Sequence, residues 1–102
     1  MTDQRELVIS HPGQILKEEF LDEMGITVYA LSKAISVPRS RINEIVLGRR
    51  SITADTAVRL GRFFNADPQN WINLQSHYDV VMAENTVDFS SIKTLEEIKA
   101  QH

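Results

Sequence analysis

The chain has 102 residues, 42% of them hydrophobic and 25% charged, and it contains no cysteine. This composition fits one small globular domain and excludes disulfide frameworks, cysteine nucleophiles and cysteine-based zinc sites. The formal net charge of −3 combines two opposed regions: residues 26–64 carry seven basic and two acidic side chains, a net charge of +5, whereas the remaining residues carry four basic and twelve acidic side chains, a net charge of −8. We therefore expect two kinds of partner.

Neither a membrane span nor a secretory signal is predicted. The longest uninterrupted apolar runs, 28–31 and 80–83, have four residues each, whereas a helix needs roughly 20 to cross a bilayer. The N-terminus has acidic residues on both sides of Arg5 and lacks the apolar stretch of a signal peptide. The expected location is the cytoplasm, without a membrane partner.

Five helices are predicted from residues that start and stop helices. Proline is tolerated in the first helical turn, where its missing N–H would be unpaired anyway, and three prolines precede apolar-periodic segments: Pro12, Pro38 and Pro68. Three residues that tolerate positive φ follow such segments: Gly25, Gly48 and Asn65. With Thr27 and Thr53 as N-caps, the predicted helices are 12–24, 27–35, 38–47, 53–64 and 68 to about 84.

Apolar spacing supports these helices and predicts an all-α fold. Side chains that recur every three or four residues share one buried helical face; the sets are Leu16, Phe20 and Met24, then Ile42, Ile45 and Val46, then Leu60, Phe63 and Phe64, and finally Trp71, Leu74 and Tyr78. The last set is expected in the core or at a dimer interface; the alternative is that these side chains stack against a ligand. Strand alternation is restricted to a candidate short extended piece at Val87 and Phe89.

Both ends of the chain lie outside this predicted domain of residues 12–84. Residues 1–11 form an N-terminal arm with a small apolar patch, Leu7, Val8 and Ile9. Residues 85–102 form a C-terminal extension in which Thr94 can cap a short helix. Either arm can be docked on the domain or on a partner, or can be a frayed end.

Residues 27–48, TVYALSKAISVPRSRINEIVLG, have the spacing of a helix-turn-helix, with the motif itself at 27–47. Two helices flank the turn Ser36-Val37, and Ser32 and Ser36 occupy places that require small residues. If the turn is left-handed, Ser36 costs about 1 kcal/mol. An ordinary helical hairpin with a solvated basic face is the alternative; the +5 charge of residues 26–64, which contain this motif, favours DNA binding.

The outward face of the second helix carries residue types that read bases. Arginine can donate two hydrogen bonds to guanine, asparagine can pair similarly with adenine, and serine can serve either. Arg39, Ser40 and Asn43 are therefore the base-contact candidates, and Arg41 can contact a base or a phosphate. Glu44 can accept from cytosine or pair with a neighbouring arginine, and its role stays open.

Phosphate-contact candidates surround this face. Helix starts favour anions, which indicates Thr27 and Thr53. Cationic side chains complete the set: Lys33, Arg49 and Arg50.

The chain also resembles a family, the HigA-type antitoxins of type II toxin–antitoxin systems, within the lambda-repressor-like (XRE-type) helix-turn-helix class. The resemblance covers about residues 9–84 and is carried by HPGQILKEEFLDEMGI, LSKAISVPRSRINEIVLGRRSITADTAVRL and DPQNWINLQSHYD. It implies a five-helix domain that dimerises and represses its own operon by binding a palindromic operator. It also implies neutralisation of a small RelE-like toxin that cleaves mRNA.

The resemblance places Arg39, Ser40, Arg41 and Asn43 on the family's recognition helix and Thr53 at its phosphate-binding helix start. The sequence departs from the family at Val28 and Leu47, where polar or basic residues are common, so those two DNA contacts are not carried over.

Four acidic side chains crowd one side of the first predicted helix: Glu18, Glu19, Asp22 and Glu23. A basic mRNA-binding toxin would be attracted to such a face, so these are candidate toxin contacts. A plain solvated helix surface is the alternative.

Catalysis, a cofactor and a metal site are not expected. The three histidines, at positions 11, 77 and 102, lack the i, i+4 spacing of a helical metal pair, and the four glycines cannot form a phosphate-cradling loop. Two hypotheses remain: an antitoxin that also represses transcription, and a stand-alone repressor without a toxin partner.

Overall fold

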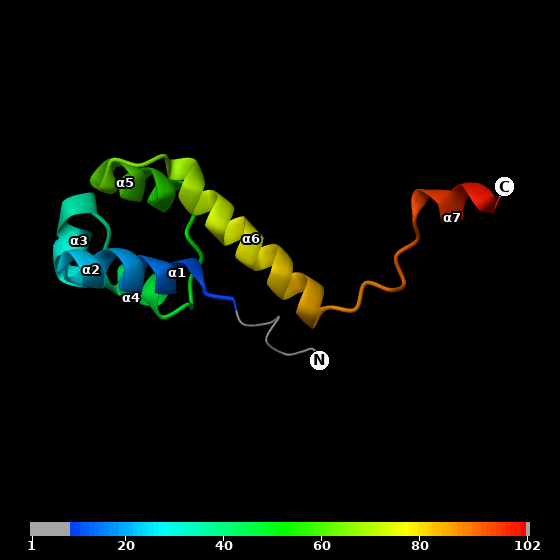
Figure 1. The fold of residues 1–102 in the computed structure, drawn as a ribbon, viewed down its shortest axis with the longest axis horizontal. Coiled ribbons are helices and arrows are strands. Elements are labelled where there is room, and N and C mark those ends of the chain that lie inside the picture. Colours follow the sequence, from blue (N-terminus) through cyan, green and yellow to red (C-terminus); the bar gives the residue numbers. More distant parts are fainter. Residues whose placement is uncertain (1–8, 102) are drawn as a thin grey trace.

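Helices make up nearly all of the regular structure in the computed structural model, which describes residues 9–101 (Figure 1). In chain order they are α1 (Pro12–Ile15), η2 (Leu16–Leu21), α2 (Asp22–Met24), α3 (Val28–Ile35), α4 (Arg39–Val46), α5 (Ala54–Phe64), α6 (Pro68–Thr86) and α7 (Leu95–Ala100). The first three form one continuous rod with a π-helical middle, so the predicted first helix is present. The all-α prediction is confirmed; Val87 has extended backbone, but no strand occurs within residues 9–101.

The helix ends are capped as the sequence predicts. Thr27 accepts a hydrogen bond from the Ala30 N–H, and Thr53 accepts one from the Thr56 N–H. Left-handed residues close the C-terminal ends, where the N–H of the following residue reaches back five positions; these residues are Gly25, Ser36, Gly48 and Asn65. Ser36 has a φ of 58°, so the turn is left-handed and the conformational cost considered from the sequence applies.

The core lies where the rod, α3, α4, α5 and the first half of α6 meet. Its large, fully buried side chains are Leu16, Leu21, Leu31, Ile42, Ile45 and Leu60. Phe20 adds an aromatic cluster, since its ring centroid lies 5.0 Å from those of both Phe64 and Trp71. One contiguous core therefore holds both helices of the predicted helix-turn-helix.

Three members of the predicted buried faces are exposed: the assignments of Met24 and Phe63 were wrong, and Leu74, predicted for the core or a dimer interface, does not belong to the core. Met24 is 54% exposed because the π-helical turn of η2 shifts the inward face, and Leu21, five residues after Leu16, takes the buried position instead. Leu74 and Phe63 are also exposed. At Leu74 the inward position belongs to its neighbour Gln75, which is buried four residues after Trp71.

Gly13 marks the closest approach between the rod and α4. A Cβ atom at this position would overlap the carbonyl oxygen of Ile45. Gly13 is itself buried, and its N–H donates to the Nδ1 atom of His11 at 2.9 Å. The absence of a side chain here lets α4 rest directly on the start of the rod.

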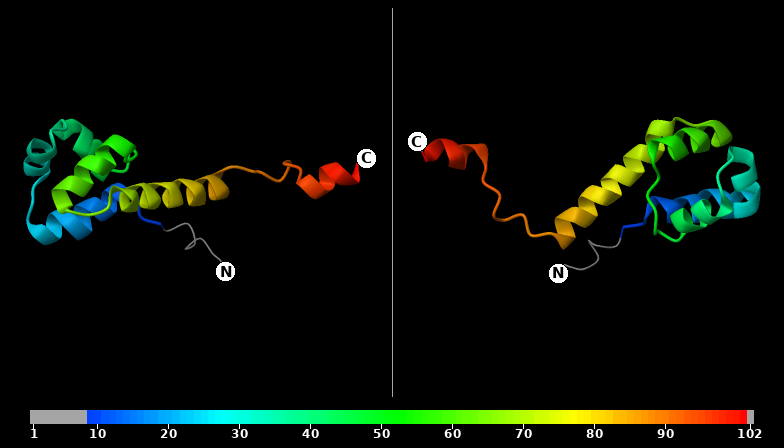
Figure 2. Two further views of the ribbon diagram at one scale, coloured as in Figure 1. Left: turned by 90° about the horizontal axis from the view of Figure 1, so that it is seen from above. Right: turned by 180° about the vertical axis from the view of Figure 1, so that it is seen from behind.

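The rod, α3, α4, α5 and the first half of α6 form a helical body, and the C-terminal arm, residues 87–101, extends away from this body (Figure 2). Helix α6 projects from the body, and the arm with α7 continues outward in every view. Its large apolar side chains are exposed: Val87, Phe89, Ile92, Leu95 and Ile98. The predicted cap at Thr94 is confirmed, since Thr94 and Glu97 form a reciprocal capping box at the start of α7.

At the other end, Ile9 is half-buried, whereas Leu7 and Val8 of the predicted apolar patch lie outside the described residues. Across residues 9–101, none of the helices combines the length and apolar character that crossing a bilayer requires.

Candidate nucleic-acid interface

Helix α4 presents the predicted base-contact residues outside its buried face. Ile42 and Ile45 point inward and are fully buried. Arg39, Ser40 and Asn43 are exposed, and Arg41 is half-buried. The helix is thereby held by apolar contacts on one side, while its polar side chains remain accessible on the other.

The predicted phosphate-contact residues are exposed around this helix. Thr27 and Thr53 lie at the N-termini of α3 and α5, where their hydroxyl groups also act as caps. Lys33 lies on α3, and Arg49 and Arg50 lie in the turn after α4. Helix N-termini and cations both favour an anion, so the structure leaves all five positions accessible to one.

Glu44, whose role the sequence leaves open, faces Arg49. Its Oε2 atom lies 3.9 Å from the Arg49 guanidinium; the Arg49 side chain is largely exposed and that of Glu44 is partly exposed. A pair of this length in water contributes little to stability. It does reduce the repulsion that an acidic side chain would exert on a polyanion.

Tyr29, which the sequence analysis does not single out, lies between two of the predicted contacts. The Lys33 ammonium lies 5.8 Å and the Arg39 guanidinium 5.7 Å from the centroid of its ring. Both distances are typical of cation–π contacts. The spacing of four residues between Tyr29 and Lys33 is visible in the sequence, but the contact with Arg39 crosses the turn.

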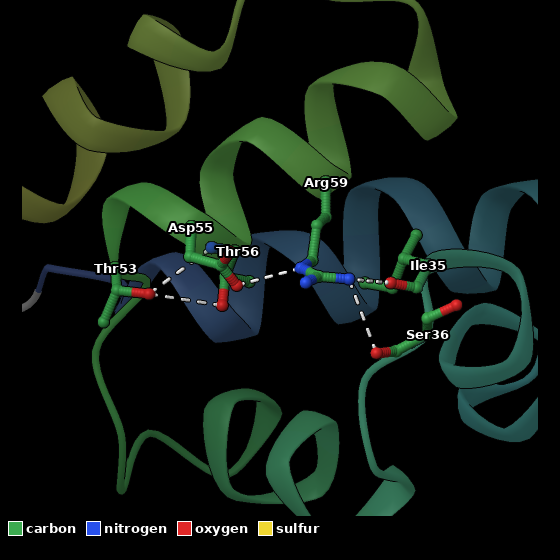
Figure 3. Close-up of polar contacts among 6 residues, drawn as sticks. All are labelled: Ile35, Ser36, Thr53, Asp55, Thr56 and Arg59. Carbon is green, nitrogen blue, oxygen red and sulfur yellow. Dashed lines mark hydrogen bonds and ion pairs between the residues drawn. The ribbon is translucent and has the colours of Figure 1, made fainter.

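Arg59 contributes to the positive charge of residues 26–64, yet it has a structural role (Figure 3). Its NH1 atom donates to the carbonyl oxygen of Ile35 at 2.8 Å and to that of Ser36 at 3.4 Å. Its Nε atom donates to Asp55 at 2.9 Å. Because the last carbonyls of a helix attract cations, Arg59 ties α5 to the C-terminus of α3 and fixes the turn before α4.

The turn that carries Arg49 and Arg50 is anchored from α6. The buried side chain of Gln75 accepts a hydrogen bond from the Ile52 N–H at 2.8 Å and donates to Asp79 at 2.9 Å. A buried N–H without a partner would cost about 1–3 kcal/mol, so this contact holds the loop in one position.

His11 supports the same region from the N-terminal side. Its ring makes an edge-on contact with Tyr78, with centroids 4.9 Å apart. Burial lowers the pKa of His11, and the negative charge of Asp79 opposes part of that shift. The neutral imidazole is the form that can accept the Gly13 N–H, so the lowered pKa matches its role as a cap.

The predicted toxin-contact residues lie on the rod, over η2 and α2, and all four are exposed: Glu18, Glu19, Asp22 and Glu23. Lys17 pairs with Asp22, with its Nζ atom 2.8 Å from one carboxylate oxygen. The acidic face therefore remains accessible to a partner.

The three residues predicted for the core or a dimer interface have different surroundings. Trp71 is 3% exposed and belongs to the core. Tyr78 is half-buried against His11, and Leu74 is exposed. Among residues 9–101 no three His, Cys, Asp or Glu side chains are grouped as a metal site would require.

Comparison with known proteins places this arrangement in a family. A helix-turn-helix family model matches residues 16–71, which span η2, α2, α3, α4, α5 and the start of α6. The chain belongs to the helix-turn-helix family. It is also 54% identical over 81 residues to virulence-associated protein I of Dichelobacter nodosus, a match that covers 79% of this chain and 75% of that protein.

Two solved structures show what such chains bind. Antitoxin HigA of Pseudomonas aeruginosa, solved with the higBA promoter, is 42% identical, with a TM-score of 0.78 over 84% of this chain and 97% of that one. Antitoxin GraA, solved in complex with its operator, is 37% identical, with a TM-score of 0.80 over 84% of this chain and 90% of that one. The predicted resemblance to HigA-type antitoxins is therefore confirmed.

Proposed function

We propose that this chain is an antitoxin that binds a palindromic operator as a homodimer, represses its own operon and neutralises a small basic RelE-like toxin in the cytoplasm. One observation supports the DNA-binding part above all others. The outward face of α4 exposes Arg39, Ser40 and Asn43 on a helix whose other face is fully buried, in a fold whose relatives were solved on operator and promoter DNA. The domain that performs this function is residues 12–84.

In this proposal the two kinds of DNA contact have separate tasks. Arg39, Ser40, Asn43 and Arg41 read base edges in the major groove, because their donors and acceptors match guanine and adenine. A second group contacts phosphates and sets the register of the helix: Thr27, Lys33, Arg49, Arg50 and Thr53. Two copies would place two recognition helices about 34 Å apart in successive major grooves.

The acidic face of the rod is the proposed toxin contact. The side chains of Glu18, Glu19, Asp22 and Glu23 are exposed together, and a toxin that binds mRNA is expected to be basic. The exposed Leu74 and the half-buried Tyr78 are proposed to lie near the dimer contact.

Selection from a random DNA pool tests the DNA-binding part. The wild-type chain is expected to enrich a palindrome, and Arg39→Ala or Asn43→Ala should cost about 1–3 kcal/mol of affinity and relax the preference at one position. Arg50→Ala should weaken specific and random DNA equally and reduce the salt dependence. Failure of the wild type to enrich any sequence would contradict the proposal.

A second candidate function is a stand-alone repressor without a toxin partner, which the shared helix-turn-helix fold equally allows. Co-expression with a small basic protein encoded next to this gene distinguishes the two. The antitoxin predicts that the toxin loses its lethality and co-purifies with this chain. Replacing Glu18, Glu19, Asp22 and Glu23 by glutamine should weaken that complex and leave operator binding intact, whereas a toxin that stays lethal supports the stand-alone repressor.

A further inference from the structure

The ring of Tyr29, on α3, lies beside the start of α4, the second helix of the helix-turn-helix. Tyr29 is the second residue of α3 and is 55% exposed, and Arg39 is the first residue of α4. Between them is an open cleft of about 600 Å³ that is also lined by Lys33 and Ser36. The Tyr29 ring and the cationic side chains of Lys33 and Arg39 lie together along this cleft, beside the proposed base-reading face.

Arg39 needs such a support because its position on α4 is electrostatically unfavourable. The N-terminus of a helix carries a partial positive charge, which repels a cation in the first turn. The first turn of α4 has no acidic residue, and within residues 9–101 no carboxylate lies at ion-pair distance from Arg39. The face of the Tyr29 ring, 5.7 Å from the guanidinium, offers the compensating negative potential.

We propose that Tyr29 is a positioning residue for sequence recognition, whose ring holds the Arg39 guanidinium in place before DNA arrives. This inference rests on the proposed DNA-binding function and assigns to α3 a part in specificity. A long arginine side chain that is already ordered loses less conformational entropy when it contacts a base. Lys33, 5.8 Å from the same ring, lies beside it as a phosphate contact.

The consequence is that discrimination at a single base pair depends on two residues from different helices. A general structural role for Tyr29 would instead change the affinity for all DNA equally, or lower stability. Tyr29 is more than half exposed, so replacement by leucine removes the ring face and leaves the core intact.

The experiment uses the sequence that the wild-type chain enriches from a random DNA pool and its single-base variants. At the base pair whose preference Arg39→Ala abolishes, Tyr29→Leu should lower discrimination about two- to fivefold, the range expected for an exposed cation–π contact. Tyr29→Phe, which keeps the ring, should retain the wild-type discrimination. The double variant Tyr29→Leu/Arg39→Ala should discriminate no less than Arg39→Ala alone.

Phe63→Leu is the matched control, because it removes an exposed aromatic ring from α5; it should leave discrimination unchanged. Equal losses at every base pair for Tyr29→Leu, or losses that add to those of Arg39→Ala, would overturn the inference while leaving the proposed function in place. If the wild-type chain enriches no sequence, the proposed function fails, and this inference fails with it.

Discussion

The helical body and the C-terminal arm use their apolar residues in opposite ways. In the body, Leu16, Ile42 and Leu60 are fully buried, and these core contacts hold α4 with its polar side chains exposed. In the arm, Ile92 is 66% and Leu95 is 64% exposed. Among residues 9–101, the contacts that position the proposed recognition helix lie in the body, whereas the arm carries apolar side chains that no other described residue covers.

The difference shows that the residues whose burial stabilises the fold lie in one part of the chain and its uncovered apolar side chains lie in another. A segment that buries no apolar area contributes little to the free energy of unfolding. A segment that does bury apolar area also fixes the position of the side chains on the proposed DNA-binding face. Four changes, in order of decreasing effect on stability, test this division.

The largest effect is expected at the contact between the rod and α4. Gly13→Ala places a Cβ atom on the Ile45 carbonyl, which is backbone and cannot move aside without shifting α4. We expect a loss of about 3 kcal/mol or more in the free energy of unfolding, measured by chemical denaturation, together with weaker DNA binding.

Gly25→Ala is the control for this change. Gly25 has a positive φ of 67°, but a Cβ atom there meets nothing within 4 Å. Only the backbone cost of about 1–2 kcal/mol should appear. Equal losses for both variants would show that the close approach at Gly13 is unimportant.

The second effect concerns the anchor between α6 and the loop after α4. Gln75→Leu leaves the buried N–H of Ile52 without an acceptor and should cost about 1–3 kcal/mol. Gln69→Leu, on the exposed side of the same helix, should change stability by less than about 0.5 kcal/mol. Thermal unfolding followed by circular dichroism compares the two; similar melting temperatures would contradict the anchoring role.

Gln75 also shows where the sequence stops being informative. The helix starts and ends at Thr27, Gly25 and Asn65 were predictable because each cap depends on a local pattern of a few residues. The hydrogen bond from Ile52 to Gln75 joins residues 23 positions apart. No local pattern reports such a contact, although burial of Gln75 could have been inferred from its spacing of four residues after Trp71.

The same limit applies to the proposed site. The outward face of α4 follows from helical periodicity once Ile42 is taken as buried, so Arg39 and Asn43 could be named from the sequence. Arg59 could not be separated from the other cations, because its carbonyl acceptor on Ile35 lies 24 positions away. The exposed position of Met24 was unpredictable for a different reason: a π-helical turn changes the periodicity itself.

The third effect is a dependence of stability on pH that His11 introduces into the body. Because the pKa of His11 is lowered in the folded state, the unfolded chain binds a proton more readily. The contribution of the neutral ring is complete above the unfolded pKa of about 6.5 and is lost as the pH falls through the folded pKa. Stability should therefore decrease on acidification from pH 7.5 to 5.5.

A matched variant isolates this residue from other titrating groups. His11→Asn can still accept the Gly13 N–H as an N-cap but does not titrate in this range. Its unfolding free energy, measured by urea denaturation across the same pH values, should fall less steeply than that of the wild type. Identical slopes would remove His11 as the cause.

The smallest effect on stability is expected from the arm. A chain that ends at Thr86 should unfold within about 0.5 kcal/mol of the full chain at a concentration where both are monomeric, because the exposed side chains of Ile92, Leu95 and Ile98 support nothing in the body. At higher concentration the melting temperature of the full chain should rise more steeply than that of the shortened chain if the arm covers its apolar surface on a second copy. A large loss of stability in the monomer would mean that the arm folds back onto the body in solution, and the division between the two regions would fail. Ile92→Ser/Ile98→Ser in the full-length chain separates the apolar contacts from chain length, since it should remove the difference in concentration dependence between the two chains and leave the monomer's stability unchanged.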